Sequence, residues 1–179
     1  MVTLGPIEGL GTQWWFELFD CKEARADGVR ARLSAHIAQF DRDYSRFRTD
    51  SYICRLNAGE VILSPPAELN ELLQFGLTWY QRTDSHFNFL TGHVQEARGY
   101  DADYSFTSHP TRTTALHPHD HLTITPERVE LAAGKLDLGG FGKGFLIDQL
   151  ATLLGEEFRL SRFLINGGGD MYAASDDEP

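Results

Sequence analysis

Apolar and polar residues alternate near the start of the chain in patterns that predict one strand and one helix. Residues 12–19 (TQWWFELF) are aromatic and β-prone, and we expect them to form the first strand. A set of apolar residues then recurs at helical spacing: Val29, Leu33 and Ile37. Asp27 is a suitable N-cap, so this spacing predicts a helix from there to about Gln39.

A short helix and a short strand should follow. Residues 41–50 are too polar for regular structure, and Asp50 and Ser51 then begin a short helical turn that Gly59 can close. Residues 61–63 (VIL) predict a short strand.

A longer helix should begin at Ser64 and Pro65, which suit the N-cap and the first helical position. Its apolar face is formed by four leucines: Leu69, Leu72, Leu73 and Leu77. The helix should reach about Tyr80 and break at residues 83–85, after which residues 86–89 form a short strand or an ordered loop. Residues 91–119 show no convincing period.

The second half of the chain contains hairpin signals and one more helix. Strands are predicted at 121–125, 129–131 and 162–165, and Gly134 turns the chain into 135–138. The helix should run from Gly144 to Leu154 with Ile147, Leu150 and Leu154 inward and Gly155 as its stop. This mixture predicts an α+β fold, in one domain over residues 1–179. The turn composition of residues 175–179 suggests that a longer protein continues from here.

Charge and composition exclude several classes of protein. The 179 residues carry 16 Lys and Arg against 26 Asp and Glu, a net charge of −10, so binding to nucleic acid is not expected. No apolar run is long enough for a membrane span, and the N-terminus lacks the features of a signal peptide, so we expect a cytoplasmic protein. Cys21 and Cys54 are expected to be buried or half-buried thiols without a catalytic role.

Two glycine-rich segments are the strongest candidates for chemistry. Residues 137–144 (DLGGFGKG) precede a helix and offer backbone amides, a helix N-terminus and Lys143, which together suit a phosphate or a diphosphate. The spacing fits neither a Walker A loop nor a dinucleotide fingerprint, and a tight, closely packed connection explains the glycines equally well. Residues 166–170 (NGGGD) indicate close approach of a ligand or of another segment.

Two other groups of polar residues favour structural explanations. Half of the basic residues lie within 22–55, where a solvated helix face and a polar loop explain them better than an anion site. His117, His119 and His121 alternate and could bind zinc or nickel if they lay on a strand. Pro118 and the absence of carboxylate or Cys partners favour a polar turn instead.

In order along the chain, five short motifs resemble those of the ApbE family, the FAD:protein FMN transferases. They are residues 10–14 (LGTQW), 45–51 (SRFRTDS) with 55–57 (RLN), 83–88 (TDSHFN), 137–144 with Asp148, and 163–170 (FLINGGGD), with Gly92 and Gly99 at later family glycines. The resemblance implies an ApbE-like, T-fold-like mixed and largely antiparallel sheet with packed helices.

The resemblance also implies a reaction. In this family FAD lies in a cleft, Mg²⁺ bridges its diphosphate, and a threonine hydroxyl of a client flavoprotein attacks the FMN phosphorus with release of AMP. The cation neutralises charge that gathers on the diphosphate in this in-line displacement. FAD as substrate, Mg²⁺ and a client flavoprotein with an acceptor threonine are therefore the expected partners.

Site residues follow from the resemblance position by position. Leu10 stands at an apolar contact to FAD, and Phe47 at an aromatic ring that packs on the flavin. Asp137 would hydrogen-bond FAD, and Lys143 stands at a polar contact to it. The family's residues near the cofactor are replaced by His86, Phe87 and Asn88. Gly140 stands at a metal ligand, where a backbone carbonyl can serve because Mg²⁺ accepts hard oxygen of any origin.

The family's C-terminal motifs, which complete its magnesium site, have no counterpart before Pro179. The chain is therefore expected to lack the C-terminal part of the fold, either as the truncated portion of a longer transferase or as a degenerate relative, and to be inactive by itself. Three functions stay open: FMN transfer to a client, hydrolysis of FAD to FMN and AMP, and a flavin-binding or structural role without catalysis.

Overall fold

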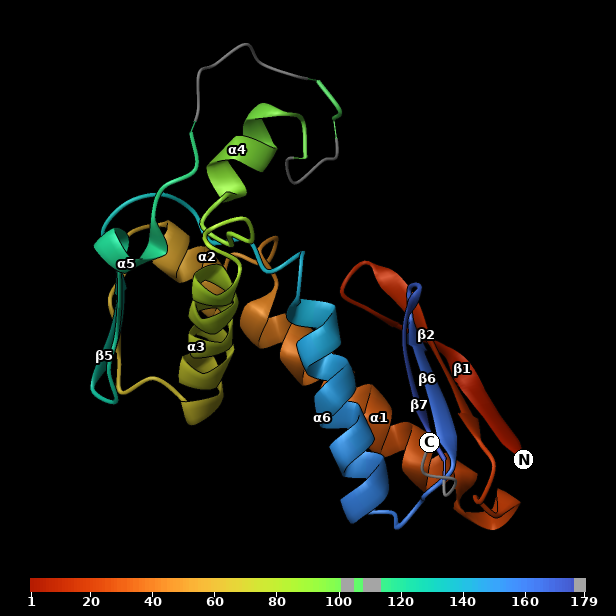
Figure 1. Ribbon diagram of the computed structural model, residues 1–179. Coiled ribbons are helices and arrows are strands. Elements are labelled where there is room, and N and C mark those ends of the chain that lie inside the picture. The colour runs from red at the N-terminus through yellow and green to blue at the C-terminus, as the bar shows by residue number, and fades with distance from the viewer. Residues whose placement is uncertain (101–104, 108–113, 176–179) are drawn as a thin grey trace. The chain divides into compact units, whose positions relative to one another are not determined.

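The computed structural model describes residues 1–100, 105–107 and 114–175, and the chain forms two compact units (Figure 1). Unit 1 comprises Met1–Arg42 and Phe141–Pro179, and unit 2 comprises Asp43–Gly140. That residues 1–179 form one domain stays a prediction. The predicted turn at 175–179 lies, except for Ser175, outside the described residues.

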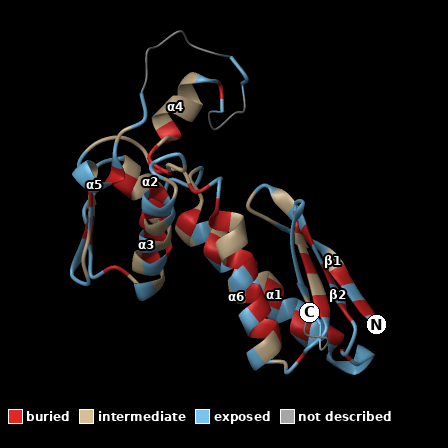
Figure 2. Cartoon of the chain, in the orientation of Figure 1, coloured by how far each residue is buried: buried red, intermediate tan, exposed pale blue. Residues whose placement is uncertain are grey.

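Unit 1 contains a four-stranded antiparallel sheet with the strand order β1-β2-β6-β7. Its strands are β1 (Val2–Gly9), β2 (Thr12–Leu18), β6 (Phe163–Gly167) and β7 (Asp170–Ala174). Helices α1 (Glu23–Tyr44) and α6 (Gly142–Glu156) cover one face of this sheet, although the last two residues of α1 belong to unit 2 (Figure 1). Alternate residues of β2 are buried, namely Trp14, Phe16 and Leu18. Figure 2 shows buried positions on the strands of this sheet in red.

Two elements of unit 1 differ from the sequence prediction at the N-terminal side. Residues 12–19 contain the second strand rather than the first, because β1 precedes them. The alternation of apolar and polar residues in β1 is interrupted at Gly5 and Pro6, where the pairing register shifts between Leu4 and Ile7. Helix α1 begins four residues before the predicted cap Asp27 and continues past Gln39.

The reason for the longer α1 lies in its apolar stripe. Phe40 and Tyr44 continue the spacing of the predicted buried residues, and both are almost completely buried. Residues 41–44 are therefore helical, against the prediction that 41–50 are irregular. The predicted buried stripe at Val29, Leu33 and Ile37 is confirmed.

Helix α6 also runs longer than predicted, starting two residues before Gly144. It passes through the predicted stop, Gly155, and ends at Glu156. Gly155 has no positive φ and therefore does not act as a C-cap; Arg159, three residues after the helix, is the residue with φ +56°. The inward positions Ile147, Leu150 and Leu154 are confirmed as buried.

In its described residues, unit 2 combines four helices with a three-stranded antiparallel sheet in the order β3-β5-β4. The strands are β3 (Ile62–Leu63), β4 (Leu122–Ile124) and β5 (Arg128–Leu131), and the helices are α2 (Tyr52–Asn57), α3 (Ala67–Arg82), α4 (Gly92–Ala97) and α5 (Pro118–His121). Ser51, one of the two residues predicted to begin this helix, caps α2, and Gly59 follows the helix with φ +83° as predicted. The four predicted leucines of α3 are buried.

The start of α3 was predicted two residues too early. Pro66 is its N-cap, because Ser64 is still tied to the sheet: its amide donates to the carbonyl of Glu127 at 2.8 Å. Helices α4 and α5 lie in the part of the chain without a visible period, and at six and four residues they are too short to produce one. Residues 86–89 form a loop, and no strand forms at 135–138.

The predicted α+β class with largely antiparallel sheets and packed helices is confirmed. Within the described residues, no helix combines the length and the apolarity that a membrane crossing requires.

Candidate functional site

Most of the site residues predicted from the resemblance belong to unit 2. These are Phe47, His86, Phe87, Asn88, Asp137 and Gly140, whereas Leu10 and Lys143 belong to unit 1. The glycine-rich segment 137–144 is shared: residues 137–140 lie in unit 2 and residues 141–144 in unit 1.

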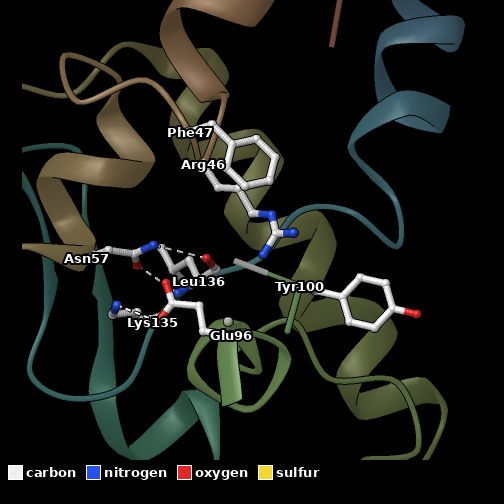
Figure 3. Close-up of a pocket in the computed structure, with 8 residues that line it drawn as sticks. Arg46, Phe47, Asn57, Glu96, Tyr100, Lys135 and Leu136 are labelled. Carbon is white, nitrogen blue, oxygen red and sulfur yellow. Dashed lines mark hydrogen bonds and ion pairs between the residues drawn. The ribbon is translucent and has the colours of Figure 1, made fainter. Parts of the chain in front are cut away.

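A polar pocket lies in unit 2 between the loop after α1, the end of α2, helix α4 and the segment that leads to Asp137 (Figure 3). It is lined by Arg46, Phe47, Asn57, Gly92, Glu96, Tyr100, Lys135 and Leu136. The basic and acidic side chains of its wall are paired, since Lys135 donates to Glu96 at 2.6 Å. Among the predicted site residues, Phe47 lines this pocket.

Asp137 lies directly beyond the pocket residue Leu136, and its carboxylate is held from two sides. The amide of Gly139 donates to Oδ1 at 2.9 Å, and Arg46 approaches Oδ2 at 3.4 Å. The side chain of Asp137 is 11% exposed and that of Arg46 is 18% exposed. The backbone amide of Asp137 donates to the carbonyl of Phe89 at 2.8 Å. These three contacts give Asp137 a defined orientation.

The backbone next to Asp137 is held by two further contacts. The side-chain amide of Asn57 donates to the Leu136 carbonyl at 3.0 Å, and its oxygen accepts from the Leu136 amide at 2.7 Å (Figure 3). The Gly92 amide donates to the Lys135 carbonyl at 2.9 Å, and a Cβ at Gly92 would lie 2.9 Å from the Lys135 side chain. The end of α2 and the start of α4 thus hold the backbone of Lys135 and Leu136 in place.

Phe47 is an aromatic residue that is 40% exposed. The guanidinium of Arg46 lies over this ring, 4.4 Å from its centroid, and in Figure 3 it points into the space between Leu136 and Tyr100. Arg46 therefore connects the aromatic ring with the carboxylate of Asp137. Sequence reasoning missed Arg46, because it stands among basic residues that were interpreted as a solvated face; its position between the motif residues Ser45 and Phe47 was the available signal.

The loop that carries Phe47 is tied to its neighbours at both ends. Ser51 donates from Oγ to the Ser45 carbonyl at 2.6 Å while it caps α2. On the other side, Tyr44 is 2% exposed and is hydrogen-bonded to Glu68. Burial first, and then the negative charges of Glu68 and Asp43, raise the pKa of Tyr44 far above its ordinary value.

The loop after α3 holds three predicted site residues in different environments. His86 is exposed, and its Nδ1 lies 2.8 Å from the Thr83 carbonyl. Phe87 is half-buried, and its amide donates to Thr83 Oγ1 at 2.9 Å. The side chain of Asn88 donates to the Leu116 carbonyl at 2.8 Å and accepts from the Leu90 amide at 2.8 Å. Asn88 therefore braces the backbone, and the bond that it donates needs a side-chain amide, which a carboxylate at this position could not supply.

Gly139 and Gly140 are exposed, and a Cβ at Gly140 would lie 3.5 Å from the ring of Phe87. Gly140, the predicted metal position, thus lies next to the predicted site residue Phe87. Within residues 1–100, 105–107 and 114–175, no three His, Cys, Asp or Glu side chains gather in a way that could hold a metal ion.

In unit 1, Leu10 and Lys143 lie near the tips of the two hairpins. Leu10 has φ +51° and Gly11 has φ +70°, so both occupy the turn between β1 and β2. The Leu10 amide donates to Asp41 at 3.3 Å. Lys143, in the first turn of α6, is 3.5 Å from the carboxylate of Asp170, the first residue of β7.

The second glycine segment, 166–170, forms the turn between β6 and β7. A Cβ at Gly167 would lie 2.5 Å from the Trp14 ring, and one at Gly168 would lie 2.4 Å from Thr12 Oγ1. Of the two explanations left open by the sequence, close approach of another segment therefore accounts for these two glycines. Gly169, with φ +101°, has open space around it and is required by the turn.

The alternating histidines lie in a helical turn rather than on a strand. His117 Nδ1 is 2.5 Å from the Tyr80 hydroxyl, and His119 Nε2 is 3.1 Å from the Gln81 amide. These polar contacts agree with the predicted polar turn. Both cysteines are free thiols; Cys21 is buried and Cys54 is half-buried, as predicted.

Comparisons with known proteins agree with the resemblance. The sequence profile of the ApbE family matches residues 10–179. Over 177 residues the chain is 25% identical to the FAD:protein FMN transferase of Klebsiella pneumoniae (strain 342), covering 92% of this chain and 50% of that protein.

Two solved structures share the fold. The apo flavinyl transferase ApbE of Pseudomonas stutzeri matches with a TM-score of 0.79 and 20% identity, over 97% of this chain and 60% of that one. A mutant of the flavin transferase ApbE of Vibrio cholerae matches with a TM-score of 0.81 and 17% identity, over 97% of this chain and 62% of that one.

The chain thus spans half to about three fifths of the length of these relatives. The family profile covers nearly all of its residues, and the order of motifs, the fold and the sequence identity agree with that match. The chain belongs to the ApbE family.

Proposed function

We propose that this protein acts in the transfer of FMN from FAD to a threonine hydroxyl of a client flavoprotein, with release of AMP. The observation that carries the proposal is the carboxylate of Asp137, held by Arg46 and the Gly139 amide beside the exposed ring of Phe47. Family membership and the curated transferase at 25% identity support it.

The residues present in unit 2 fit a flavin nucleotide. The exposed face of Phe47 offers a flat apolar surface for the isoalloxazine ring. The Asp137 carboxylate can accept hydrogen bonds from N–H or O–H groups of FAD. His86, Phe87 and Asn88 belong to the same proposed site, in which Phe87 supplies apolar contact and Asn88 holds the loop backbone.

The reaction is a displacement at the FMN phosphorus. The threonine Oγ forms a bond to this phosphorus, the bond between phosphorus and the bridging oxygen breaks, and AMP leaves with that oxygen. The threonine proton passes to a general base. The chain's own contribution is to bind and orient FAD so that the phosphorus is accessible to the attacking hydroxyl.

We also propose that the reaction depends on Mg²⁺, which would neutralise charge on the diphosphate. Gly140 can contribute a backbone carbonyl. The described residues do not complete a metal site, since they contain no cluster of three acidic, His or Cys side chains.

The test is a flavinylation assay on the protein expressed from its own gene. It is incubated with FAD, Mg²⁺ and a client flavoprotein domain, and the client is examined for covalent flavin fluorescence on a denaturing gel. The matched control is the same client with its acceptor threonine replaced by alanine. Labelling of the threonine-containing client alone supports the proposal.

The other outcomes separate the alternatives. Release of FMN and AMP without labelled client identifies an FAD pyrophosphatase. FAD that is bound but unchanged identifies a flavin-binding protein without catalysis, and FAD that is not bound at all rejects the flavin site.

A further inference from the structure

We propose that Asn57 is a positioning residue that acts on FAD through Asp137. The inference rests on the proposed function, because it concerns the same flavin site. Asn57 does not need to contact the ligand: its side chain holds the backbone of Leu136, and Leu136 immediately precedes Asp137.

The geometry of this contact is specific to a carboxamide. Nδ2 donates to the Leu136 carbonyl at 3.0 Å while Oδ1 accepts from the Leu136 amide at 2.7 Å, so one side chain satisfies both backbone groups of one residue (Figure 3). Leu136 is completely buried, so these backbone groups have little access to water. A buried amide or carbonyl that loses its partner is strongly destabilised, which makes the pairing a firm constraint.

Asn57 itself is held in place by the helix that carries it. It is the last residue of α2, whose N-terminus is capped by Ser51, and Ser51 also donates to the carbonyl of Ser45. One end of α2 therefore anchors the loop of Arg46 and Phe47, and the other end anchors the segment of Asp137. The short helix sets the spacing between the aromatic ring and the carboxylate.

The distance between the Phe47 ring and the Asp137 carboxylate is important because Arg46 contacts both groups. Arg46 lies over the ring of Phe47 and approaches the carboxylate of Asp137 at 3.4 Å. A shift of the Leu136 backbone would therefore change the position of this carboxylate relative to Arg46 and Phe47. We expect Asn57→Ala to release the backbone on both sides of Leu136. Asn57→Asp keeps the acceptor for the Leu136 amide and loses the donor, so its effect should be smaller.

The experiment is a titration of FAD into the full chain, followed by quenching of flavin fluorescence. We expect Asn57→Ala to weaken FAD binding by about tenfold and Asn57→Asp by about threefold. The decisive variant is Asn57→Ala combined with Asp137→Ala. It should bind FAD as weakly as Asp137→Ala alone, because Asn57 acts through the residue that has been removed.

Asn70 provides a matched control in the same unit. Its side-chain amide donates to the Thr125 carbonyl at 3.3 Å, so Asn70→Ala also removes a brace from a backbone carbonyl, but beside the turn between β4 and β5. Asn70→Ala should lower the thermal midpoint without changing FAD affinity by more than about twofold.

Each remaining outcome has a clear meaning. Unchanged affinity in Asn57→Ala, with weak binding in Asp137→Ala, overturns the inference and leaves the proposed function standing. Losses that multiply in the double variant also overturn it, since they show independent action. If Asn57→Ala does not fold, the FAD affinity of Asn57→Asp is compared with that of wild type: a loss of about threefold supports the inference, and an unchanged affinity overturns it. A wild-type chain that does not bind FAD rejects both proposals.

Discussion

Phe47 and Phe19 are exposed to nearly the same extent as residues, 40% and 41%, but they have different neighbours. Phe47 carries the guanidinium of Arg46 over its ring and lines the polar pocket. We expect Phe47→Ala to weaken FAD binding by about tenfold, because an aromatic stacking contact contributes on the order of 1–2 kcal/mol. Fluorescence titration with FAD measures the effect.

The control for this variant is Phe19→Ala, which removes an equally exposed ring in unit 1. It should leave FAD affinity unchanged. Equal losses in the two variants would show that Phe47 acts only through general destabilisation.

Tyr44 leads to a prediction about alkaline stability. Burial and nearby carboxylates raise its pKa in the folded chain above the ordinary value of 10.0. Below pH 10 the hydroxyl keeps its proton in both states and its stabilising contribution is complete. Above pH 10 only the unfolded chain loses this proton, so the free energy of unfolding falls by up to about 1.4 kcal/mol per pH unit.

Tyr44→Phe should remove this slope, while at pH 8 it costs about 1 kcal/mol because the hydrogen bond to Glu68 is lost. Urea unfolding of wild type and variant at pH 8, 10 and 11 gives the difference. Tyr172→Phe, which alters a more exposed residue, should retain the wild-type dependence. A parallel decline in wild type and Tyr44→Phe would contradict the assignment.

At the scale of elements, close packing between β6 and β2 depends on the absence of a side chain at Gly167. A Cβ there would lie 2.5 Å from the Trp14 ring in the core of unit 1. We expect Gly167→Ala to reduce the free energy of unfolding by about 1–3 kcal/mol. Thermal and urea unfolding measure it.

Gly28 is the comparison that separates packing from backbone effects. It lies within α1, and a Cβ there meets nothing within 4 Å. Gly28→Ala should therefore stabilise the chain by about 0.5–1 kcal/mol. The same substitution at these two glycines should have opposite signs, and destabilisation by both would refute the packing argument.

Elements with a long apolar period could be predicted from the sequence, and short or interrupted ones could not. The stripes of α1, α3 and α6 were recognised because their buried residues recur over several turns. Strand β1 was missed because Gly5 and Pro6 interrupt its alternation, and α4 and α5 are too short to show a period. The predicted helix ends were wrong where a tertiary contact sets the end of the helix, as at Ser64, whose amide donates to the carbonyl of Glu127.

The candidate site residues that could be predicted are those that lie at positions of the family motifs. Phe47 and Asp137 were identified from the resemblance, and the structure places each beside Arg46. The roles of Arg46 and Asn57 could not be predicted, because each depends on a contact with a residue about 80 or 90 positions away in the sequence. The assignment of ligand contacts to the predicted residues stays a prediction.

At the scale of the whole molecule, we expect residues 1–179 to bind FAD without converting it. Under the proposed function, binding would need the ring of Phe47 and the carboxylate of Asp137, whereas displacement at phosphorus would also need neutralisation of the diphosphate charge. We expect residues 1–179 alone to release AMP from FAD and Mg²⁺ no faster than buffer, because the described residues contain no cluster suited to a metal.

Chromatographic measurement of AMP over time tests this, with a family member of known activity as positive control. Rapid Mg²⁺-dependent release by residues 1–179 would show that the metal ligands had been overlooked.

Strand β7 lies at the edge of the four-stranded sheet, and within the described residues it pairs with β6 alone. Its backbone groups that face away from β6 have no ladder partner, and four of its five side chains are exposed. In deuterated water the outward amides of β7 should take up label first, long before those of β2, which pairs on both sides. This isotope signal makes β7 an internal reporter: any strand that adds to the sheet at this edge will slow its labelling.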